Sequence, residues 1–379
     1  MSESIVVAIL ALVGSLFTIV IIQARRSMLY VYCNATISAW EARLLPEARL
    51  MEFVDSPKVV NVLAGLDDTD YRTYLADIPR VEDIDVVAVE RSLNANLSAR
   101  YRELLEILPK ERKATIMRFV QRVDLWNLKV LLAAIHNKVP REKRLEETVP
   151  SPAFPRERLE LLASAENFEE LLEYFKGTEY FNVLAAALED YKKLGLIAVL
   201  SALDRHYYTA LWKDVLSKKA QRSVLKVVLG YEMDAVNIKL ILRLKKEGVS
   251  SDEIAKRLIL PSHELSEGML RAMIAADDIP SAIRTISRTT YGPVLLQALP
   301  QFEATGSLFT LEKALDEGLF RVCKWLSVTQ LFSIAPVITH IYLKWAEFRN
   351  LRAIIRLKAD KVEPEKIKET LVKVPKLEL

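Results

Sequence analysis

Glycine is scarce in this sequence, with 10 among 379 residues, whereas average usage of about 7% would give roughly 26. The shortage argues against folds that depend on glycine turns, namely phosphate-cradling loops, sheet sandwiches and Rossmann crossovers. Leu, Ala, Glu, Lys and Arg dominate instead, and these residues favour helices. The composition therefore predicts an all-α protein.

Cysteine is scarcer still, with 2 residues in the chain. Cys33 and Cys323 lie far apart and form no C-x-x-C unit, so we expect two reduced, buried thiols and no disulfide framework. An excess of one charge is lacking too, because 53 basic and 50 acidic residues leave a formal net charge of +3. That balance excludes a general electrostatic binder of nucleic acid.

Catalytic signatures are missing from the sequence. It contains no phosphate-binding G-x-x-x-x-G-K-[ST], no dinucleotide G-x-G-x-x-G and no nucleophile elbow G-x-S-x-G. The four histidines have no metal-ligand spacing: His136, His206, His263 and His340. We therefore expect a protein that is not an enzyme and that holds no cofactor or metal.

One long hydrophobic run lies near the N-terminus. Ile5–Ile22 is uncharged over 18 residues, which as a helix would span about 27 Å. Arg25 and Arg26 follow the run, and no signal-peptide cleavage site does. We therefore predict an uncleaved transmembrane anchor in residues 1–27 that contacts membrane lipid, with the N-terminus outside and the remaining chain at the cytoplasmic side of the cell membrane. The alternative, a buried soluble helix, would need a polar face that is missing here.

A local pattern recurs three times at nearly constant spacing. The pattern consists of an acid, an Asn three residues later and a base two residues after the Asn. Its three copies are Asp124, Asn127 and Lys129; Asp234, Asn237 and Lys239; and Glu347, Asn350 and Arg352. A valine follows each Asn by twelve residues. An upstream acid precedes each Asn by 37, 33 and 38 residues; these acids are Glu90, Asp204 and Glu312. The pattern predicts three related helical bundles in residues 28–150, 151–262 and 263–379.

The recurring acid and Asn share one helix face, because they are three residues apart. A ligand-binding amide repeated three times is one interpretation. The other, which we favour, is a structural Asn that satisfies a helix terminus or the upstream acid. On that interpretation we expect the upstream acid to pack against the Asn–base motif of its own bundle.

Charge is spread unevenly along the chain. Residues 47–90 hold eleven acids and four bases, whereas residues 211–257 hold eleven bases and six acids. The asymmetry predicts polar contacts with separate partners, although a solvated face also explains a single charged stretch.

The segment from Tyr30 to Leu45 reads YVYCNATISAWEARLL and resembles the start of the C subunit of archaeal A-type ATP synthases, a family similar to the d subunit of vacuolar-type proton pumps. The threefold motif also resembles that family, and the match spans residues 28 to about 375. The resemblance implies three pseudo-threefold-related helical bundles that form a funnel.

The same resemblance implies a function. The chain would be a single-copy, non-catalytic rotor subunit that couples the central stalk to the membrane proteolipid ring and transmits torque for ATP synthesis or hydrogen-ion transport. Ile5–Ile22 would then enter the centre of the ring, on the rotation axis. The alternative is a membrane-anchored helical-repeat adaptor that recruits cytosolic partners, which would form an open solenoid.

Overall fold

The computed structural model describes residues 3–81, 84–146, 148–151, 153–217 and 222–374, with the backbone alone at 3–11, 23, 26, 27, 29, 217, 222 and 223. Every regular element in these ranges is a helix. The all-α prediction is therefore confirmed for this part of the chain.

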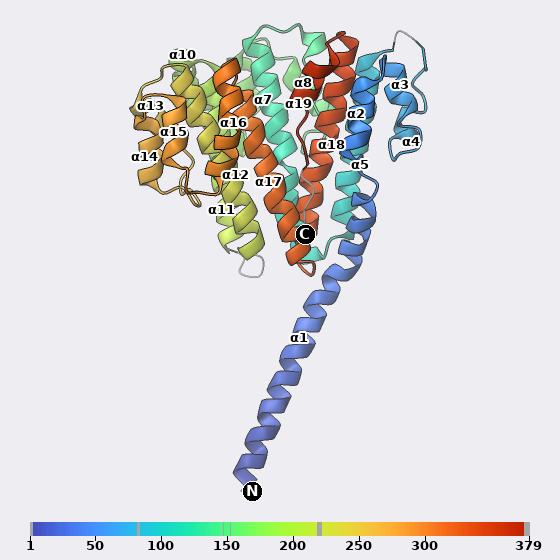
Figure 1. Ribbon diagram of the computed structural model, residues 1–379, viewed down its shortest axis with the longest axis vertical. Coiled ribbons are helices and arrows are strands. Elements are labelled where there is room, and N and C mark those ends of the chain that lie inside the picture. The colour runs from blue at the N-terminus through green and yellow to red at the C-terminus, as the bar shows by residue number, and fades with distance from the viewer. Residues whose placement is uncertain (1–2, 82–83, 147, 152, 218–221, 375–379) are drawn as a thin grey trace.

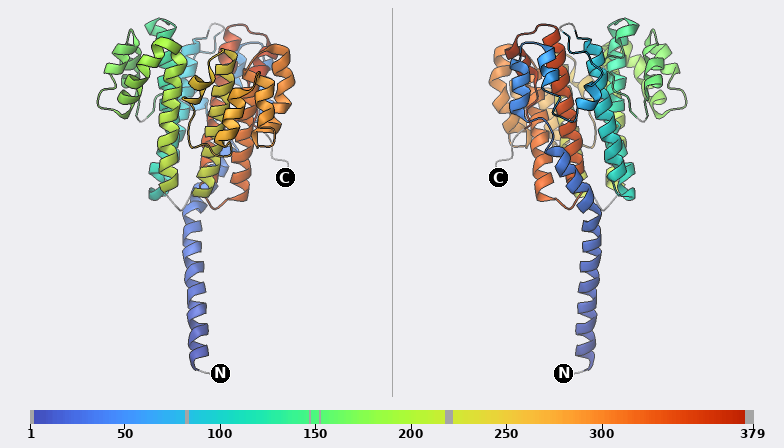
Figure 2. Two further views of the ribbon diagram at one scale, coloured as in Figure 1. Left: turned by 90° about the vertical axis from the view of Figure 1, so that its left-hand side faces the viewer. Right: turned by 90° about the vertical axis from the view of Figure 1, so that its right-hand side faces the viewer.

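The first helix, α1 (Glu3–Glu41), runs without a break from the N-terminal region into the body of the protein (Figure 1). Its later turns pack against α18 and bury Tyr30, Cys33 and Ile37. Its earlier part extends away from the body in both views of Figure 2. Leu12 and Phe17 are 65% and 67% exposed there.

The predicted transmembrane anchor is not supported. Among the described residues, no helix is both long and apolar enough to cross a membrane. The apolar run is the outer part of a longer helix whose later turns pack on the body, so it is not a separate element. Residues 5–11 of Ile5–Ile22 lie outside the described side chains. Lipid contact through this run and an external N-terminus are equally unsupported.

The remaining helices are described in three groups, in the order in which they follow one another along the chain. Group 1 contains α2 (Glu47–Asp55), α3 (Val59–Ala64), α4 (Arg72–Leu75), α5 (Val86–Ile107), α6 (Lys110–Val120), α7 (Arg122–His136) and η1 (Arg141–Lys143). Group 2 contains α8 (Arg156–Ala163), α9 (Phe168–Glu173), α10 (Glu179–Leu194), α11 (Leu196–Ser217), α12 (Arg222–Lys246) and α13 (Ser251–Ala255). Group 3 contains α14 (Glu267–Ala275), α15 (Ile279–Thr285), α16 (Tyr291–Thr305), α17 (Phe309–Thr329), α18 (Ala335–Ala359) and α19 (Pro364–Thr370).

The long helices contact one another in a closed order. α5 packs against α6, α6 against α11, α11 against α12, α12 against α17, α17 against α18, and α18 against α5. A continuous hydrophobic core runs through all three groups. Since group 3 returns to group 1, the row of helices is closed, whereas an open solenoid would keep its two ends apart.

The recurring valine lies just after the end of the motif helix in each group. The residue before it adopts a left-handed backbone, at Lys138 (φ 53°), Gly248 (φ 70°) and Lys361 (φ 57°). The N–H of each valine donates to a carbonyl five residues earlier, in the pairs Val139–Ala134, Val249–Leu244 and Val362–Leu357. This is a Schellman motif, in which a hydrophobic residue follows the left-handed position.

Glycine at the left-handed position should stabilise the fold. Lys138→Gly and Lys361→Gly are each expected to raise the free energy of unfolding by about 1 kcal/mol, because a Cβ is strained at positive φ. Chemical denaturation measures the change. Gly248→Ala is the matched control and should lower stability by a similar amount; a loss of stability in both lysine variants would contradict this account.

Candidate functional site

Each motif asparagine is buried and binds both backbone polar groups of one residue. The side-chain amide N–H donates to a carbonyl, and the amide oxygen accepts the N–H of the same residue, 22 positions later, at 2.7–3.0 Å: Asn127 with Val149, Asn237 with Ile259 and Asn350 with Val372. The expected partners, a helix terminus or the upstream acid, were therefore wrong. Because the amide serves the backbone with both of its polar atoms, it is occupied in a structural role.

Each motif base forms an ion pair with an acid of another group. Lys129 of group 1 lies 2.5 Å from Asp204 of group 2, and Lys239 of group 2 lies 2.5 Å from Asp316 of group 3. Arg352 of group 3 forms an ion pair with Glu90 of group 1 at 3.2 Å.

A second set of ion pairs lies one helical turn later. Arg243 pairs with Glu312 at 2.5 Å, and Arg356 pairs with Glu90 at 2.8 Å. Together the two sets use the three upstream acids, but each acid pairs with a base of the preceding group. The expectation of pairing within one bundle was wrong, because the base lies beyond the face that the acid and Asn share.

The motif acid binds the stretch that leads into the next group. Asp234 accepts the backbone N–H groups of His263, Glu264 and Leu265 at 2.7–3.1 Å, and the Tyr291 hydroxyl donates to it at 3.0 Å. All of these donors belong to the beginning of group 3 or the stretch before it. Asp234 is fully buried, so these bonds replace its lost hydration.

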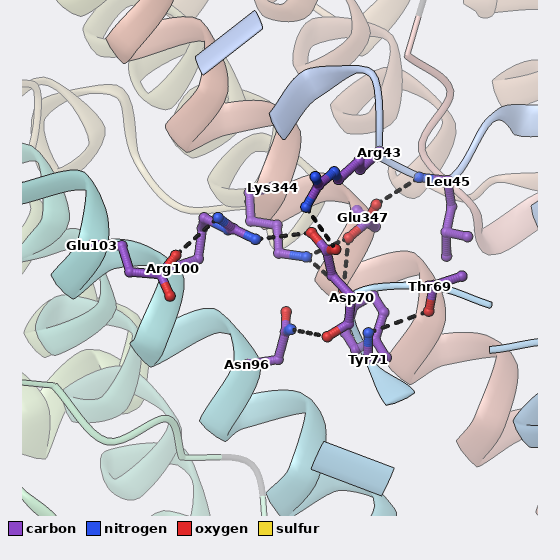
Figure 3. Close-up of polar contacts among 10 residues, drawn as sticks. All are labelled: Arg43, Leu45, Thr69, Asp70, Tyr71, Asn96, Arg100, Glu103, Lys344 and Glu347. Atoms are coloured by element: carbon purple, nitrogen blue, oxygen red, sulfur yellow. Dashed lines mark hydrogen bonds and ion pairs between the residues drawn. The ribbon is translucent and has the colours of Figure 1, made fainter. Parts of the chain in front are cut away.

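Glu347 makes the equivalent contact from group 3 back to group 1 (Figure 3). It accepts the backbone N–H of Leu45 at 2.7 Å and the Tyr71 hydroxyl at 2.6 Å. Lys344 lies 2.6 Å from Glu347 and also donates to the Tyr71 hydroxyl at 3.0 Å. Burial and the Glu347 carboxylate raise the pKa of Tyr71, so its hydroxyl stays protonated and can donate.

Asp124, the motif acid of group 1, is buried as well. The Ser151 hydroxyl, in the stretch before α8, donates to it. Burial raises the pKa of Asp124 to about 6, and the bond from Ser151 offsets only part of this effect. The carboxyl group therefore titrates close to neutral pH.

A cation from each group caps the first helix of the next group. Each donates to two carbonyls at that helix's C-terminus: Arg144 to Ala163 and Ala165, Lys245 to Ile274 and Ala276, and Lys358 to Val54 and Ser56. A cation at this position also complements the helix dipole. The sequence analysis missed these residues, although Lys245 and Lys358 share a signal, since each stands eight residues after its motif Asn.

One residue from each group meets in a partly buried polar junction. Arg122 donates to Glu232 at 2.6 and 2.8 Å and to the Tyr342 hydroxyl at 2.9 Å, while that hydroxyl donates to Glu232 at 2.6 Å. The guanidinium carbon lies 4.2 Å from the centre of the Tyr342 ring. The three residues are spaced by 110 positions, but their types differ, so no shared motif marked them in the sequence.

The end of the body from which α1 leaves carries exposed apolar side chains, which we call the apolar end: Met28, Tyr32, Trp325, Val328, Leu331 and Phe332. Tyr32 and Phe332 are 70% and 67% exposed. Asn34 of α1 donates to the carbonyls of Leu331 and Ser333, which fixes α1 beside the turn between α17 and α18. Exposed apolar side chains that lie together are often used for contact with another molecule.

The histidines and cysteines of the described part of the chain form no metal-binding cluster. Across it, no cluster of three or more His, Cys, Asp or Glu side chains could hold a metal ion. Cys33 and Cys323 are free and buried, as predicted. Burial raises the pKa of Cys33 to about 11 and lowers that of His340 to about 3, so this thiol and this imidazole are neutral at pH 7.

Known proteins are similar to this chain in sequence over most of its length. The family model described as ATP synthase (C/AC39) subunit matches residues 33–370. The chain belongs to this family. The matched region begins within α1, after the apolar run, and ends at the last residue of α19.

Two relatives illustrate the similarity. The A-type ATP synthase C subunit of Methanocaldococcus jannaschii is 32% identical over 344 residues, which are 90% of this chain and 86% of that protein. The A-type ATP synthase C subunit of Thermococcus onnurineus is 33% identical over 348 residues, which are 90% and 89% of the two chains. The resemblance seen in the sequence is thereby confirmed.

Loss of the two hydrogen bonds that one motif Asn makes to the backbone should destabilise the protein strongly. Asn237→Ala leaves the buried N–H and C=O of Ile259 without partners, so we expect the free energy of unfolding to fall by about 3 kcal/mol. Chemical denaturation tests this. Gln297→Ala, at an exposed site in α16, is the control and should change stability by less than about 0.5 kcal/mol. An equal loss of stability in the two variants would contradict a structural role for the Asn237 hydrogen bonds.

Asp124 should make stability depend on pH. Its folded pKa of about 6 lies above its ordinary value of 3.8, so its favourable contribution is present below pH 3.8 and is lost as pH rises through 6. Asp124→Asn should therefore gain stability relative to the parent chain as pH rises from about 4 to 7, by roughly 2–3 kcal/mol. Urea denaturation across this range measures the difference. A pH-independent difference between the two proteins would refute this assignment.

Proposed function

We propose that this chain is a non-catalytic rotor subunit of an A-type or V-type rotary ATP synthase. It couples the central stalk to the membrane proteolipid ring and transmits torque for ATP synthesis or ion pumping, including hydrogen-ion transport. The observation that carries the proposal is the direction of the contacts. The motif acids, the motif bases and the capping cations each join one group to the next, and all three sets return from group 3 to group 1.

The three groups are, on this proposal, three repeats in residues 28–150, 151–262 and 263–379 that surround one pseudo-threefold axis and form a funnel. Contacts that run in one direction and return to their start are typical of a closed cyclic arrangement. The junction of Arg122, Glu232 and Tyr342 supports a shared axis, since each group contributes one residue to it.

A torque-transmitting part has to resist shear between its repeats. Exposed ion pairs contribute only about 0–1 kcal/mol each, so they are poorly suited to this load. Here the links include buried groups, among them Asp234, Glu347 and Glu90. Breaking a buried pair costs about 3–5 kcal/mol, so the three repeats turn together as one body.

The apolar end supports the orientation of the subunit. It is the end from which α1 leaves, and α12 and α18 begin at the same end and run away from it (Figure 1). We place this end against the membrane ring, at the cytoplasmic side, and the opposite end toward the stalk. The closed order of helices disfavours the alternative of an open-solenoid adaptor.

Two substitutions at the apolar end should remove binding to the proteolipid ring and leave binding to the central stalk intact. Trp325→Ser combined with Phe332→Ser is expected to abolish co-purification with the proteolipid ring, because it removes exposed apolar surface, and to leave binding to the central stalk subunits unchanged. Pull-down of the co-expressed full-length chain measures both. Phe309→Ser is the matched control, since Phe309 is an exposed Phe at the other end of α17. A parent chain that binds neither partner would end the proposal.

A further inference from the structure

A cavity of about 390 Å³ lies between α5 of group 1 and the beginning of group 2. Its opposite wall belongs to the stretch that leads into group 2 and to α8, and includes Leu145, Pro150 and Leu159. The lining residues of α5 are three or four positions apart and so share one helix face: Arg91, Asn94, Ala95, Ser98 and Arg102. The volume is within the range of small-molecule sites.

Two hydrogen bonds hold the opposite wall against α5. The Asn94 amide donates to the Thr148 carbonyl at 2.9 Å, and the Ser98 hydroxyl donates to the Pro150 carbonyl at 2.7 Å. The wall therefore runs in the same direction as α5, and the cavity has an Arg91 end and an Arg102 end. Because these bonds are already formed, a ligand would enter a preformed site.

Asn94 offers an acceptor that no described residue uses. The residue is 6% exposed, and its Oδ1 atom is buried without a hydrogen-bond partner among the described residues. The bond to Thr148 fixes the orientation of the amide, since the Thr148 carbonyl needs a donor. A buried acceptor is costly to leave unpaired, so an N–H group of a ligand would satisfy Oδ1.

The Arg102 end of the cavity is basic. Arg102 is exposed and forms no ion pair with any residue that the structure describes. Arg156 of α8 lines the cavity too and follows Pro150 along the chain, so it lies toward this end. Its one ion pair among the described residues is with Glu160, on the same helix, at 2.9 Å. Arginine binds phosphate through paired N–H groups.

The acids of the lining lie toward the other end. Glu142 and Glu146 precede Thr148 along the wall, and Glu146 is already paired with Arg356 at 3.3 Å. An anionic group is therefore favoured at the Arg102 end and disfavoured at the Arg91 end. The cavity thus distinguishes the two ends of a ligand.

The Arg91 end also has an apolar surface. Val87 lies in the first turn of α5, and Tyr74 of α4 is half-buried beside the cavity. An aromatic ring is a surface on which a planar nucleobase can stack. This end therefore combines an aromatic surface with the unused oxygen of Asn94.

We propose that this cavity binds a nucleoside phosphate whose base carries an exocyclic amino group. The amino group donates to Asn94 Oδ1, the base packs on Tyr74, and the phosphate binds Arg102 and Arg156. Adenine and cytosine both present such an amino group. Nucleotide binding here would be a property beyond the proposed coupling role and does not depend on it.

Two pairs of nucleotides test how the base is read. Titration calorimetry of the full chain compares AMP with IMP and CMP with UMP, because each pair differs by an amino group replaced with a keto oxygen. A keto oxygen would face Asn94 Oδ1, so in at least one pair we expect the amino nucleotide to bind at least about fivefold more tightly. Inorganic phosphate should bind at least about tenfold more weakly than that nucleotide.

Arg102→Gln tests the phosphate end. Arg102 is exposed and has no ion pair in the described structure, so its replacement should leave the thermal unfolding transition unchanged. The affinity for the preferred nucleotide should fall at least about tenfold, because a charge-assisted contact is lost. Arg288→Gln, at an exposed arginine of group 3, is the matched control and should stay within about twofold of the parent chain.

Three results would overturn the proposal. The first is the lack of saturable binding of AMP and CMP at millimolar concentration. The second is equal affinity within both nucleotide pairs, or phosphate that binds as tightly as the nucleotides. The third is an equal change in Arg102→Gln and Arg288→Gln, which would indicate general attraction of anions to the surface. None of these measurements involves the ring or the stalk, so each leaves the proposed function as it stands.

Discussion

A buried carboxylate determines how this chain closes. Glu90 of group 1 is 1% exposed, and two arginines of group 3, Arg352 and Arg356, neutralise it. A buried charge without a partner would cost several kcal/mol, so group 3 has to pack on group 1 for the fold to form. The packing of α18 on α5 and the contact of Glu347 with Tyr71 follow from the same closure.

The closed body carries its exposed apolar side chains at the end from which α1 emerges. A body linked by buried contacts in one direction moves as a unit. These properties suit a part that joins a membrane component to a shaft.

Local features were the most predictable. The helical composition, the buried asparagines and the valine after each motif helix could all be recognised from spacing, because a helix and its C-terminal cap involve residues within about six positions of one another. The partners of Lys129, Lys239 and Arg352 were predicted wrongly, since periodicity identifies a face but not what packs on it. The apolar run of α1 was interpreted from hydrophobicity, without its continuation into a helix that packs on the body.

The sequence by itself determined that this protein is helical, that one pattern recurs three times and that Cys33 and Cys323 are buried thiols. Each of these conclusions rests on composition or on short-range spacing. Only the tertiary structure decided that the groups close on one another and that Arg122, Glu232 and Tyr342 meet. The motif bases and their acids are 75 or more residues apart, and equal spacing along a chain fits a row of repeats as well as a ring, so packing had to choose between them.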